Sequence, residues 1–428
     1  MYQAENAGDL LKQKRVVLRS RAAWISVGRT VFLLGLTSLL TDISSEMVSA
    51  VLPLYLLVRL RFSPFQVGVT DGLYQGASVL VRLMSGWIAD RWRKPKEVAA
   101  LGYGLSAVCK LGFLVAGSSW SAISAVILSD RIGKGIRTAP RDAMIAASSR
   151  RDQLATAFGV HRAMDTAGAM LGPLVAVAIL SVAPEAYDAI FVVSLCVALI
   201  GLAVITFLVE NPTEKSEDEL ARNTLPQPAQ QPAVSLRSMS HLLTITEFRT
   251  LVIIGSALAL VTVSDGLLYL VLQQRLKIAN GLFPMLYVIT AMMFMVFAIP
   301  AGRLADRIGL KPVFLIGYGL LAAVYGVLLF PRMNYGLAFL MLTLLGGYYA
   351  ATDGVFMALA SRVLPAHLRS TGLALLTTGT GLARLLASTL YGTLWNWFGA
   401  ERAFVLFIAG LITALLLAWR TIHRVEET

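Results

Sequence analysis

Residues 86–104 read GWIADRWRKPKEVAALGYG, and residues 302–319 read GRLADRIGLKPVFLIGYG, with one residue fewer. Each copy follows an apolar stretch of helical length and leads into the next one. A match of this kind at corresponding places indicates an internal duplication, as in membrane proteins built from structural repeats. The repeat therefore predicts a chain made of two related halves.

The composition is that of a membrane protein. Of the 428 residues, 57% are hydrophobic and 14% are charged, and the mean hydropathy is +0.70. Soluble domains carry about 25% charged residues. The net charge of +12 would suit nucleic-acid binding, but the basic residues are spread over short loops between apolar segments. We therefore expect the lipid bilayer as a partner and no nucleic acid.

Twelve apolar segments are long enough to cross a bilayer, which takes about 20 residues. A polar break after the sixth contains NPTEKSEDELARNTLPQPAQQP, which is charged and then rich in Pro and Gln, as in flexible linkers. We predict an all-α polytopic membrane protein with twelve transmembrane helices in two pseudo-symmetric six-helix bundles. The predicted spans are 31–58, 65–89, 98–117, 120–142, 155–182, 187–209, 250–272, 283–304, 312–330, 335–361, 371–395 and 402–420.

The loops predict the orientation, because cytoplasmic loops carry an excess of Lys and Arg. With a cytoplasmic N-terminus, the inside loops hold ten of these residues and the outside loops hold six. We therefore predict a multi-pass protein of the cell (inner) membrane with both termini in the cytoplasm. The predicted regions are a basic tail (1–28), a first bundle (29–210), a linker (211–246), a second bundle (247–420) and a final tail (421–428).

The duplicated loop contains the pattern G-x-x-x-D-R with further cations behind it. Its residues are Gly86, Asp90, Arg91 and Lys94 in the first copy and Gly302, Asp306 and Arg307 in the second. On this motif the chain resembles the major facilitator superfamily of transporters over nearly its whole length, although Arg93 stands where the family usually has Gly. The resemblance implies that Asp90 caps the eleventh span near Ser370 and serves as a conformational latch, braced by Arg91 and Lys94.

Two further patterns strengthen the resemblance. The fourth span contains R-x-x-x-G at Arg131 and Gly135. The fifth span contains a glycine motif formed by Gly159, Gly168, Gly172 and Pro173. Its spacing resembles the helix motif of antiporters, without the trailing Gly-Gly pair, and it implies a smooth surface for close helix packing. His161 and Asp165 border this surface, either as a titrating pair or, as we prefer, with His161 in packing.

The stretch SDRIGKGIRTAPRDA (129–143) places a charged face on the fourth span. At 100° per residue, its charged side chains project within an arc of about 140°. Lipid on that face would be very unfavourable, so we predict that it lines a wet cavity together with polar stripes of the first, second and eleventh spans. The predicted cavity residues are Asp71, Gln75, Arg82, Lys110, Asp130, Lys134, Arg137, Asp265, Asp353 and Arg384. Alternatively, Lys134 and Arg137 lie at the cytoplasmic mouth.

Proton coupling is assigned to Asp42, Glu46 and Arg131. Asp42 and Glu46 lie one turn apart near the middle of the first span. They repel each other in a partly dehydrated site, and a proton on one of them relieves the repulsion. Arg131 resembles the superfamily arginine that faces these acids in proton antiporters. The hypothesis is that protonation releases Arg131 and that solute or deprotonation restores the pair; the alternative is a static salt bridge.

The resulting prediction is a proton-coupled exporter (antiporter) of a small organic solute, working by alternating access. Cations outnumber acids around the fourth span, which predicts an anionic, zwitterionic or amphiphilic solute. The same-class alternative is a proton-coupled importer (symporter) of an anionic solute. A non-transporting membrane receptor would need a signalling domain, which neither the tails nor the linker supplies. An enzyme would need a nucleophile–base or metal set, and the sequence shows none. We expect a monomer without cofactor or metal.

Overall fold

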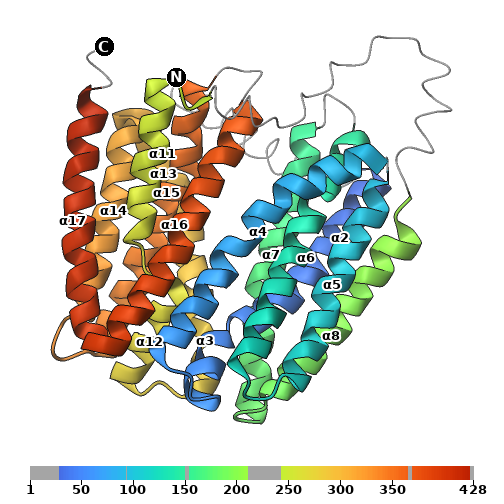
Figure 1. Ribbon diagram of the computed structural model, residues 1–428, viewed down its shortest axis with the longest axis horizontal. Coiled ribbons are helices and arrows are strands. Elements are labelled where there is room, and N and C mark those ends of the chain that lie inside the picture. Colours follow the sequence, from blue (N-terminus) through green and yellow to red (C-terminus); the bar gives the residue numbers. More distant parts are fainter. Residues whose placement is uncertain (1–27, 93, 150–153, 211–241, 365–368, 425–428) are drawn as a thin grey trace, which may run out of the picture.

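A computed structural model describes residues 28–92, 94–149, 154–210, 242–364 and 369–424. Within these ranges every regular element is a helix, and no strand occurs. The helices form two bundles that lie side by side, the first half of the chain on the right of Figure 1 and the second half on the left. The predicted all-α fold of two six-span bundles is confirmed.

The first bundle contains spans one to six. Its elements are α2 (Arg29–Ser49), α3 (Leu52–Leu54) and η1 (Tyr55–Arg59), which together make the first span, then α4 (Pro64–Trp92), α5 (Pro95–Val115), α6 (Trp120–Ala147), α7 (Leu154–Val182), and α8 (Tyr187–Ala203) continued by η3 (Val204–Leu208). Helix starts have local causes. Pro64 and Pro95 occupy first helical positions, where a missing N–H is harmless, and Ser119 caps α6 by accepting a hydrogen bond from the backbone N–H of Ala122.

The second bundle contains spans seven to twelve. Its elements are α11 (Thr246–Leu260) and α12 (Asp265–Leu276), η4 (Asn280–Leu282) and α13 (Met285–Ile308), α14 (Leu310–Leu328), α15 (Tyr335–Val363), α16 (Arg369–Phe398) and α17 (Ala400–Arg424). Gly309, with φ of 98°, separates α13 from α14. Only glycine adopts this backbone conformation readily, so the second copy of the repeat turns within one residue. The predicted linker and tails lie largely outside the described residues.

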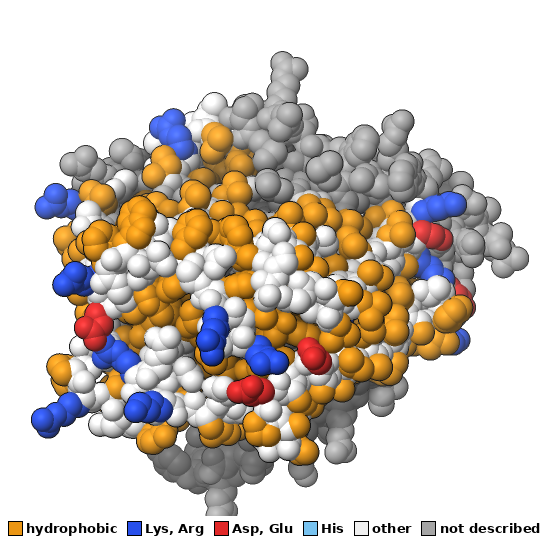
Figure 2. Space-filling view, turned by 60° about the horizontal axis from the view of Figure 1, so that its bottom comes forward, with side chains coloured by type: hydrophobic (Ala, Val, Ile, Leu, Met, Phe, Trp, Pro, Cys, Tyr) orange, Lys and Arg blue, Asp and Glu red, His pale blue; other side chains and the backbone are white. Residues whose placement is uncertain are grey.

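Apolar side chains cover the outside of the bundles. Val115, Val182 and Phe207 are 83%, 88% and 81% exposed, and Figure 2 shows hydrophobic side chains over much of the visible face. Ten described spans are long and apolar enough to cross a membrane by themselves. The other two, α4 and α6, carry the predicted polar stripes. These stripes lower the hydropathy of spans whose polar faces are turned toward other helices.

The seventh span is broken, whereas the sequence predicts one continuous helix at 250–272. α11 ends at Leu260, and α12 begins at Asp265. The Tyr325 hydroxyl bridges the break: it accepts a hydrogen bond from the Val263 N–H at 2.7 Å and donates one to the Val261 carbonyl at 3.2 Å. Backbone groups without a helical partner need such substitutes inside a membrane. Tyr325 therefore stabilises the interruption.

The two bundles meet most closely along α4 and α16, toward the bottom of Figure 1. Three glycines of α4, spaced four residues apart, make this approach possible. A Cβ on Gly68 would lie 2.5 Å from the Ser388 carbonyl oxygen, and one on Gly72 would lie 2.6 Å from that of Leu385. A Cβ on Gly76 would lie 2.8 Å from the Leu385 Cβ. Close backbone approach of this kind is typical of glycine-spaced membrane helices.

Two smaller contacts join the bundles at the same end. Between α3 and α12, a Cβ on Gly266 would lie 2.7 Å from Pro53 Cγ. Between α7 and η4, a Cβ on Gly281 would lie 3.2 Å from the Leu180 carbonyl oxygen. The end where α2 begins and α17 ends is the opposite one (Figure 1). The observed contacts therefore close the interface at the end away from the termini.

We predict that Gly72→Ala weakens this closure. The new methyl group would lie 2.6 Å from the Leu385 backbone oxygen, which has no rotamer to escape to, so α4 and α16 must separate. Leu56, 2% exposed at this end, reports the opening when replaced by Cys in a Cys109→Ala, Cys196→Ala background. Its labelling by a membrane-impermeant maleimide should accelerate. Gly326→Ala, whose methyl meets no atom within 4 Å, is the control, and equal rates in the two variants would contradict the prediction.

Candidate functional site

The charged face of α6 is turned into the first bundle. α6 packs against α4 and α5, and Asp130, Arg131 and Arg137 are only 4%, 4% and 3% exposed. Charges buried this deeply destabilise the fold unless each has a partner. The partners come from α2, α4 and α5 as well as from α6 itself.

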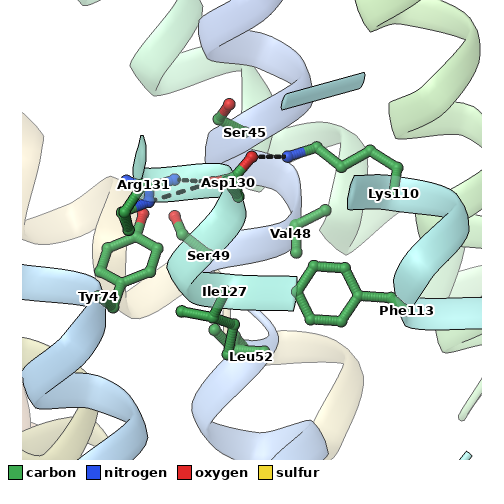
Figure 3. Close-up of a pocket in the computed structure, with 10 residues that line it drawn as sticks. All are labelled: Ser45, Val48, Ser49, Leu52, Tyr74, Lys110, Phe113, Ile127, Asp130 and Arg131. Carbon is green, nitrogen blue, oxygen red and sulfur yellow. Dashed lines mark hydrogen bonds and ion pairs between the residues drawn. The ribbon is translucent and has the colours of Figure 1, made fainter. Parts of the chain in front are cut away.

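A buried ion triad links α5 and α6 (Figure 3). Lys110 Nζ lies 2.7 Å from Asp130 Oδ1. Arg131 Nε lies 3.1 Å from Asp130 Oδ2, and a terminal guanidinium nitrogen bonds to the same oxygen. The Arg131 guanidinium also stacks 3.9 Å above the centre of the Tyr74 ring, a cation–π contact. The four side chains line a small cavity. The charged groups of this cluster are therefore bonded to one another and also border the cavity.

The structure does not show the predicted pairing of Arg131 with Asp42 or Glu46. Arg131 is held by its neighbour Asp130. Asp42 instead faces Arg137, with 3.7 Å between its Oδ1 and a terminal guanidinium nitrogen. Six residues of α-helix, about 9 Å, separate Arg131 from Arg137, and it is Arg137 that reaches α2 at the level of Asp42. The arginine nearest to this acid is therefore a different one from that predicted.

Asp42 also lies close to a second acid, Asp165 of α7, and the two carboxyl groups interact. Asp165 is 3.8 Å from Arg141 and 3.6 Å from Arg162. These ion pairs and the 3.7 Å Asp42–Arg137 pair are longer than the 2.7 Å contact in the triad. The acids of this pair are thus loosely held, and a proton shared between them would relieve their repulsion.

The glycine motif predicted on the fifth span explains how the two acids come together. A Cβ on Gly168 would lie 2.5 Å from the Leu39 carbonyl oxygen, and one on Gly172 would lie 2.8 Å from that of Ile43. α7 and α2 can approach this closely only because these positions lack side chains. Gly159 has no neighbour within 4 Å at its Cβ position and takes no part in the contact.

Lys134 of α6 and Glu46 of α2 lie close to this cluster. Both are partly exposed, and Lys134 lies in the electrostatic field of Asp42 and Glu46. Among the described residues, the Lys134 ammonium has no hydrogen bond or ion pair within contact distance. Glu46 Oε2 accepts a hydrogen bond from Ser49 at 2.6 Å. Lys134 is therefore available to a solute or to a carboxylate that moves.

A polar cluster that the sequence does not predict lies next to these acids. Ser38 joins three helices, since its hydroxyl lies 2.9 Å from His161 Nε2, 3.4 Å from the Tyr103 hydroxyl and 3.2 Å from Arg141. His161, 4% exposed, bonds to Ser38 and has no hydrogen bond to Asp165. The members are far apart in the sequence, and no local pattern connects them.

The second bundle contributes tyrosines and few charges. The Tyr349 hydroxyl donates a 2.6 Å hydrogen bond to Asp265 Oδ1. Arg384 of α16 lies beside Tyr348 and Tyr349 and in the field of Asp353, which is exposed on α15. Arg384 Nε is buried, with no hydrogen-bond partner among the described residues. The predicted residues of this half thus face one another across α12, α15 and α16.

Other predicted residues lie on α4 or in the repeated loops. Asp71 and Gln75 are partly buried, and Asp71 lines a small cavity between α3, α4 and α12. The side chains of Arg82, Gly86, Asp90 and Arg91 lie outside the described residues. Lys94, Gly302, Asp306 and Arg307 are exposed. The latch stays a prediction.

Comparisons with known proteins identify the family. The sequence profile of the Major Facilitator Superfamily matches residues 34–297 and 258–428. An uncharacterised transporter of this type from Methanocaldococcus jannaschii is 31% identical over 407 residues, 91% of this chain and 94% of the relative. The chain belongs to the major facilitator superfamily. It is accordingly a multi-pass membrane transporter.

Other proteins resemble part or most of this chain. An uncharacterised Mycobacterium tuberculosis protein is 32% identical over 163 residues, which cover 38% of this transporter and 39% of the relative. Two solved structures share the fold. The nucleoside transporter NupG has a TM-score of 0.72 at 15% identity, covering 92% of this chain and 99% of its own. A POT family transporter in complex with 5-aminolevulinic acid has a TM-score of 0.72 at 13% identity, covering 91% and 95%.

Acids from α2 and α7 offset part of the cation excess predicted around the fourth span. The charge pattern of α6 alone does not reveal these acids. The facing groups among the described residues are the cations Lys110, Arg131, Lys134, Arg137, Arg141 and Arg162 and the acids Asp42, Glu46, Asp130, Asp142 and Asp165. The first bundle therefore offers both signs of charge, which weakens the argument for a purely anionic solute.

We predict that Asp130→Asn destabilises the transporter by about 3–5 kcal/mol, because the loss of one carboxylate leaves two buried cations without a counter-charge. Lys110→Met should be milder, since Asp130 keeps Arg131. The matched control is Glu401→Gln, which removes the surface pair with Arg275 and should change stability by less than about 1 kcal/mol. Unfolding in mixed detergent micelles measures all three. Equal losses for Asp130→Asn and Glu401→Gln would refute the structural role of the triad.

Proposed function

We propose that this transporter is a proton-coupled exporter that exchanges protons for a small organic solute by alternating access. The observation that supports this most strongly is the loosely held acid pair of Asp42 and Asp165, which faces Arg137 and Arg141. A group that couples proton movement to transport must gain and lose a proton during each cycle. Permanently bonded acids such as Asp130 do not suit this task, whereas weakly paired ones do.

The position of the contacts between the bundles supports alternating access. The glycine-mediated contacts of α4 with α16, α3 with α12 and α7 with η4 lie at the end away from the termini. With the predicted cytoplasmic termini, this arrangement corresponds to an inward-facing state. Rocking of the two bundles about the central site would open the α4–α16 contact and close the opposite end.

The proton site we propose consists of Asp42 and Asp165, with Lys134 and Arg137 as the competing cations. A proton bound between the carboxyl groups would replace their repulsion by a hydrogen bond and reduce the attraction for Arg137. Loss of the proton would restore two negative charges and draw Arg137 and Arg141 back. The same cycle changes the net charge near Lys134, where a solute would bind. Proton binding and solute binding are linked in this way. Coupling through Glu46 and Arg131, the pair that the sequence predicts, is the alternative within the same cluster.

The direction of transport rests on the glycine motif of α7, which resembles that of antiporters and which packs Asp165 against Asp42. The importer alternative uses the same proton site with the opposite coupling. A receptor without transport activity would show neither solute flux nor proton movement. Solute flux in vesicles separates the three.

We predict that Asp42→Asn abolishes proton-coupled export. In everted vesicles with an acidic lumen, an exported solute added outside should collapse the pH gradient, which a pH-sensitive acridine dye reports. The amide cannot carry the exchanged proton, so the variant should show no collapse while solute–solute exchange continues. Asp165→Asn should give the same result.

Asp188→Asn, an exposed position at the start of α8, is the matched control and should behave as the unaltered protein does. Full coupling in both Asp42→Asn and Asp165→Asn would eliminate the proposed proton site. A solute that accumulates in right-side-out vesicles under an inward proton gradient would instead establish import.

A further inference from the structure

Two side chains of opposite charge keep unsatisfied atoms beside the crossing of α4 and α16. Asp71 Oδ2 and Arg384 Nε are both buried atoms for which no hydrogen-bond partner is found among the described residues. Lys110, Arg131, Arg137 and Arg141 in the first bundle all have ion-pair partners. Asp71 and Arg384 differ from these four cations because each keeps an unsatisfied buried atom, as Asp165 Oδ1 also does in the first bundle.

The helix packing places these groups at nearly the same level. Gly72, next to Asp71, contacts the carbonyl oxygen of Leu385, which is next to Arg384. The Asp71 carboxyl group also lies near the hydroxyls of Ser388, one turn further along α16, and of Ser264. No ion pair within 4.0 Å joins Asp71 to Arg384, although both side chains are long enough in principle to approach each other. The two charges are held apart at the interface between the bundles.

Asp265 of α12 lies near both groups. The Tyr349 hydroxyl fixes its Oδ1 at 2.6 Å. Asp71 forms an acidic end and Arg384 forms a basic end, and Asp265 lies within electrostatic range of both. A cavity lined by Asp71 and Gly266 opens at the acidic end, and tyrosine side chains surround the basic end.

A buried polar atom without a hydrogen bond is unfavourable, and Asp71 Oδ2 and Arg384 Nε are two such atoms on groups of opposite charge. A guanidinium is the best geometric match for a carboxylate, which it binds through two parallel hydrogen bonds. A pair of carboxylates suits an ammonium group. A ligand with both groups would satisfy both ends at once.

We propose that Asp71 and Arg384 form a two-ended binding subsite for a zwitterionic organic solute. Asp71, assisted by Asp265, takes the ammonium group, and Arg384 takes the carboxylate. The tyrosines beside Arg384 favour a solute with an apolar or aromatic body between or beside its charges. This inference rests on the proposed transport function, since it names the class of its solute, but it concerns equilibrium binding and needs no proton gradient.

The position of the subsite between the two bundles suits a transporter. α4 and α16 belong to different bundles, so a solute bound to both helices feels their relative movement. Loss of the α4–α16 contact would separate the acidic end from the basic end and weaken binding. A site of this kind changes affinity between the two states, which is what alternating access requires.

The test uses full-length protein in lipid nanodiscs at one pH. The probes are phenylalanine, its amine analogue phenethylamine and its acid analogue 3-phenylpropionate, followed by the remaining amino acids and a set of dipeptides. Binding is read as a shift in the unfolding temperature over a concentration series. We expect at least one zwitterion to bind and its amine and acid analogues to bind about tenfold to a hundredfold more weakly, because each lacks one charged hydrogen-bonded contact.

The variants assign the two ends. Arg384→Gln should remove the advantage of the zwitterion over its amine analogue, and Asp71→Asn should remove its advantage over the acid analogue. Arg332→Gln and Asp188→Asn, exposed positions away from the site, should leave all affinities unchanged. A merely structural role would lower every affinity in parallel and would overturn the assignment.

Three outcomes contradict the subsite. The first is that no zwitterion binds, while the vesicle assay shows proton-coupled export of an organic cation such as tetraphenylphosphonium; the proposed function then stands without this subsite. The second is that both variants bind the zwitterion normally. The third is that each single variant destabilises the empty protein and the double variant Asp71→Asn, Arg384→Gln restores it, which shows direct pairing instead. Zwitterion binding without any proton-coupled flux would keep the subsite and refute the exporter.

Discussion

The carboxylate of Asp130 holds two buried cations, and the arrangement of the first bundle depends on this triad. Lys110 comes from α5 and Arg131 from α6, so neither helix can turn its polar face toward lipid without breaking the cluster. In a medium of low dielectric constant, separated charges of this kind are far less favourable than paired ones. α6 is therefore enclosed by its neighbours, and the charges further along the same face must also point inward. The loosely paired groups at Asp42 and Lys134 are possible because the triad has already fixed the helix.

Glycine determines where the remaining polar groups meet. Gly168 lets α7 approach α2, which brings Asp165 to Asp42. Gly72 lets α4 approach α16, which brings Asp71 to the level of Arg384. In both places a backbone contact sets the distance between helices, and the neighbouring charged residue then lies at the edge of that contact. Glycine therefore allows close helix contacts both within one bundle and between the two bundles, and under the proposed mechanism only the second contact would break.

Hydropathy over about 20 residues is a strong signal, so the spans can be predicted from the sequence. The repeat at 86–104 and 302–319 likewise indicates two related halves. The inward direction of the α6 stripe follows from the cost of exposing charge to lipid. The partners of that stripe do not follow, because they depend on how helices distant in sequence are placed. Resemblance pairs Arg131 with α2, yet Asp130 competes for it from the adjacent position. The break in the seventh span also leaves little trace, since Val261–Ser264 contains neither Gly nor Pro.

The two halves share an ancestral pattern but differ in their interior chemistry. The first bundle has a dense set of paired ions, whereas the second has stacked and edge-on aromatic rings such as Phe314 on Phe356 and Tyr318 on Tyr348. Paired ions in a low-dielectric interior depend strongly on protonation, while neutral rings do not. Under the proposed coupling, a proton that binds among the ions would change the charge of the first bundle, whereas the aromatic contacts of the second bundle would be unaffected. Charged groups at the boundary between the bundles, including Asp71 and Arg384, would then lie in a changed electrostatic potential. Because the two bundles differ in this way, protonation would act mainly on one of them. In two identical halves it would act on both equally.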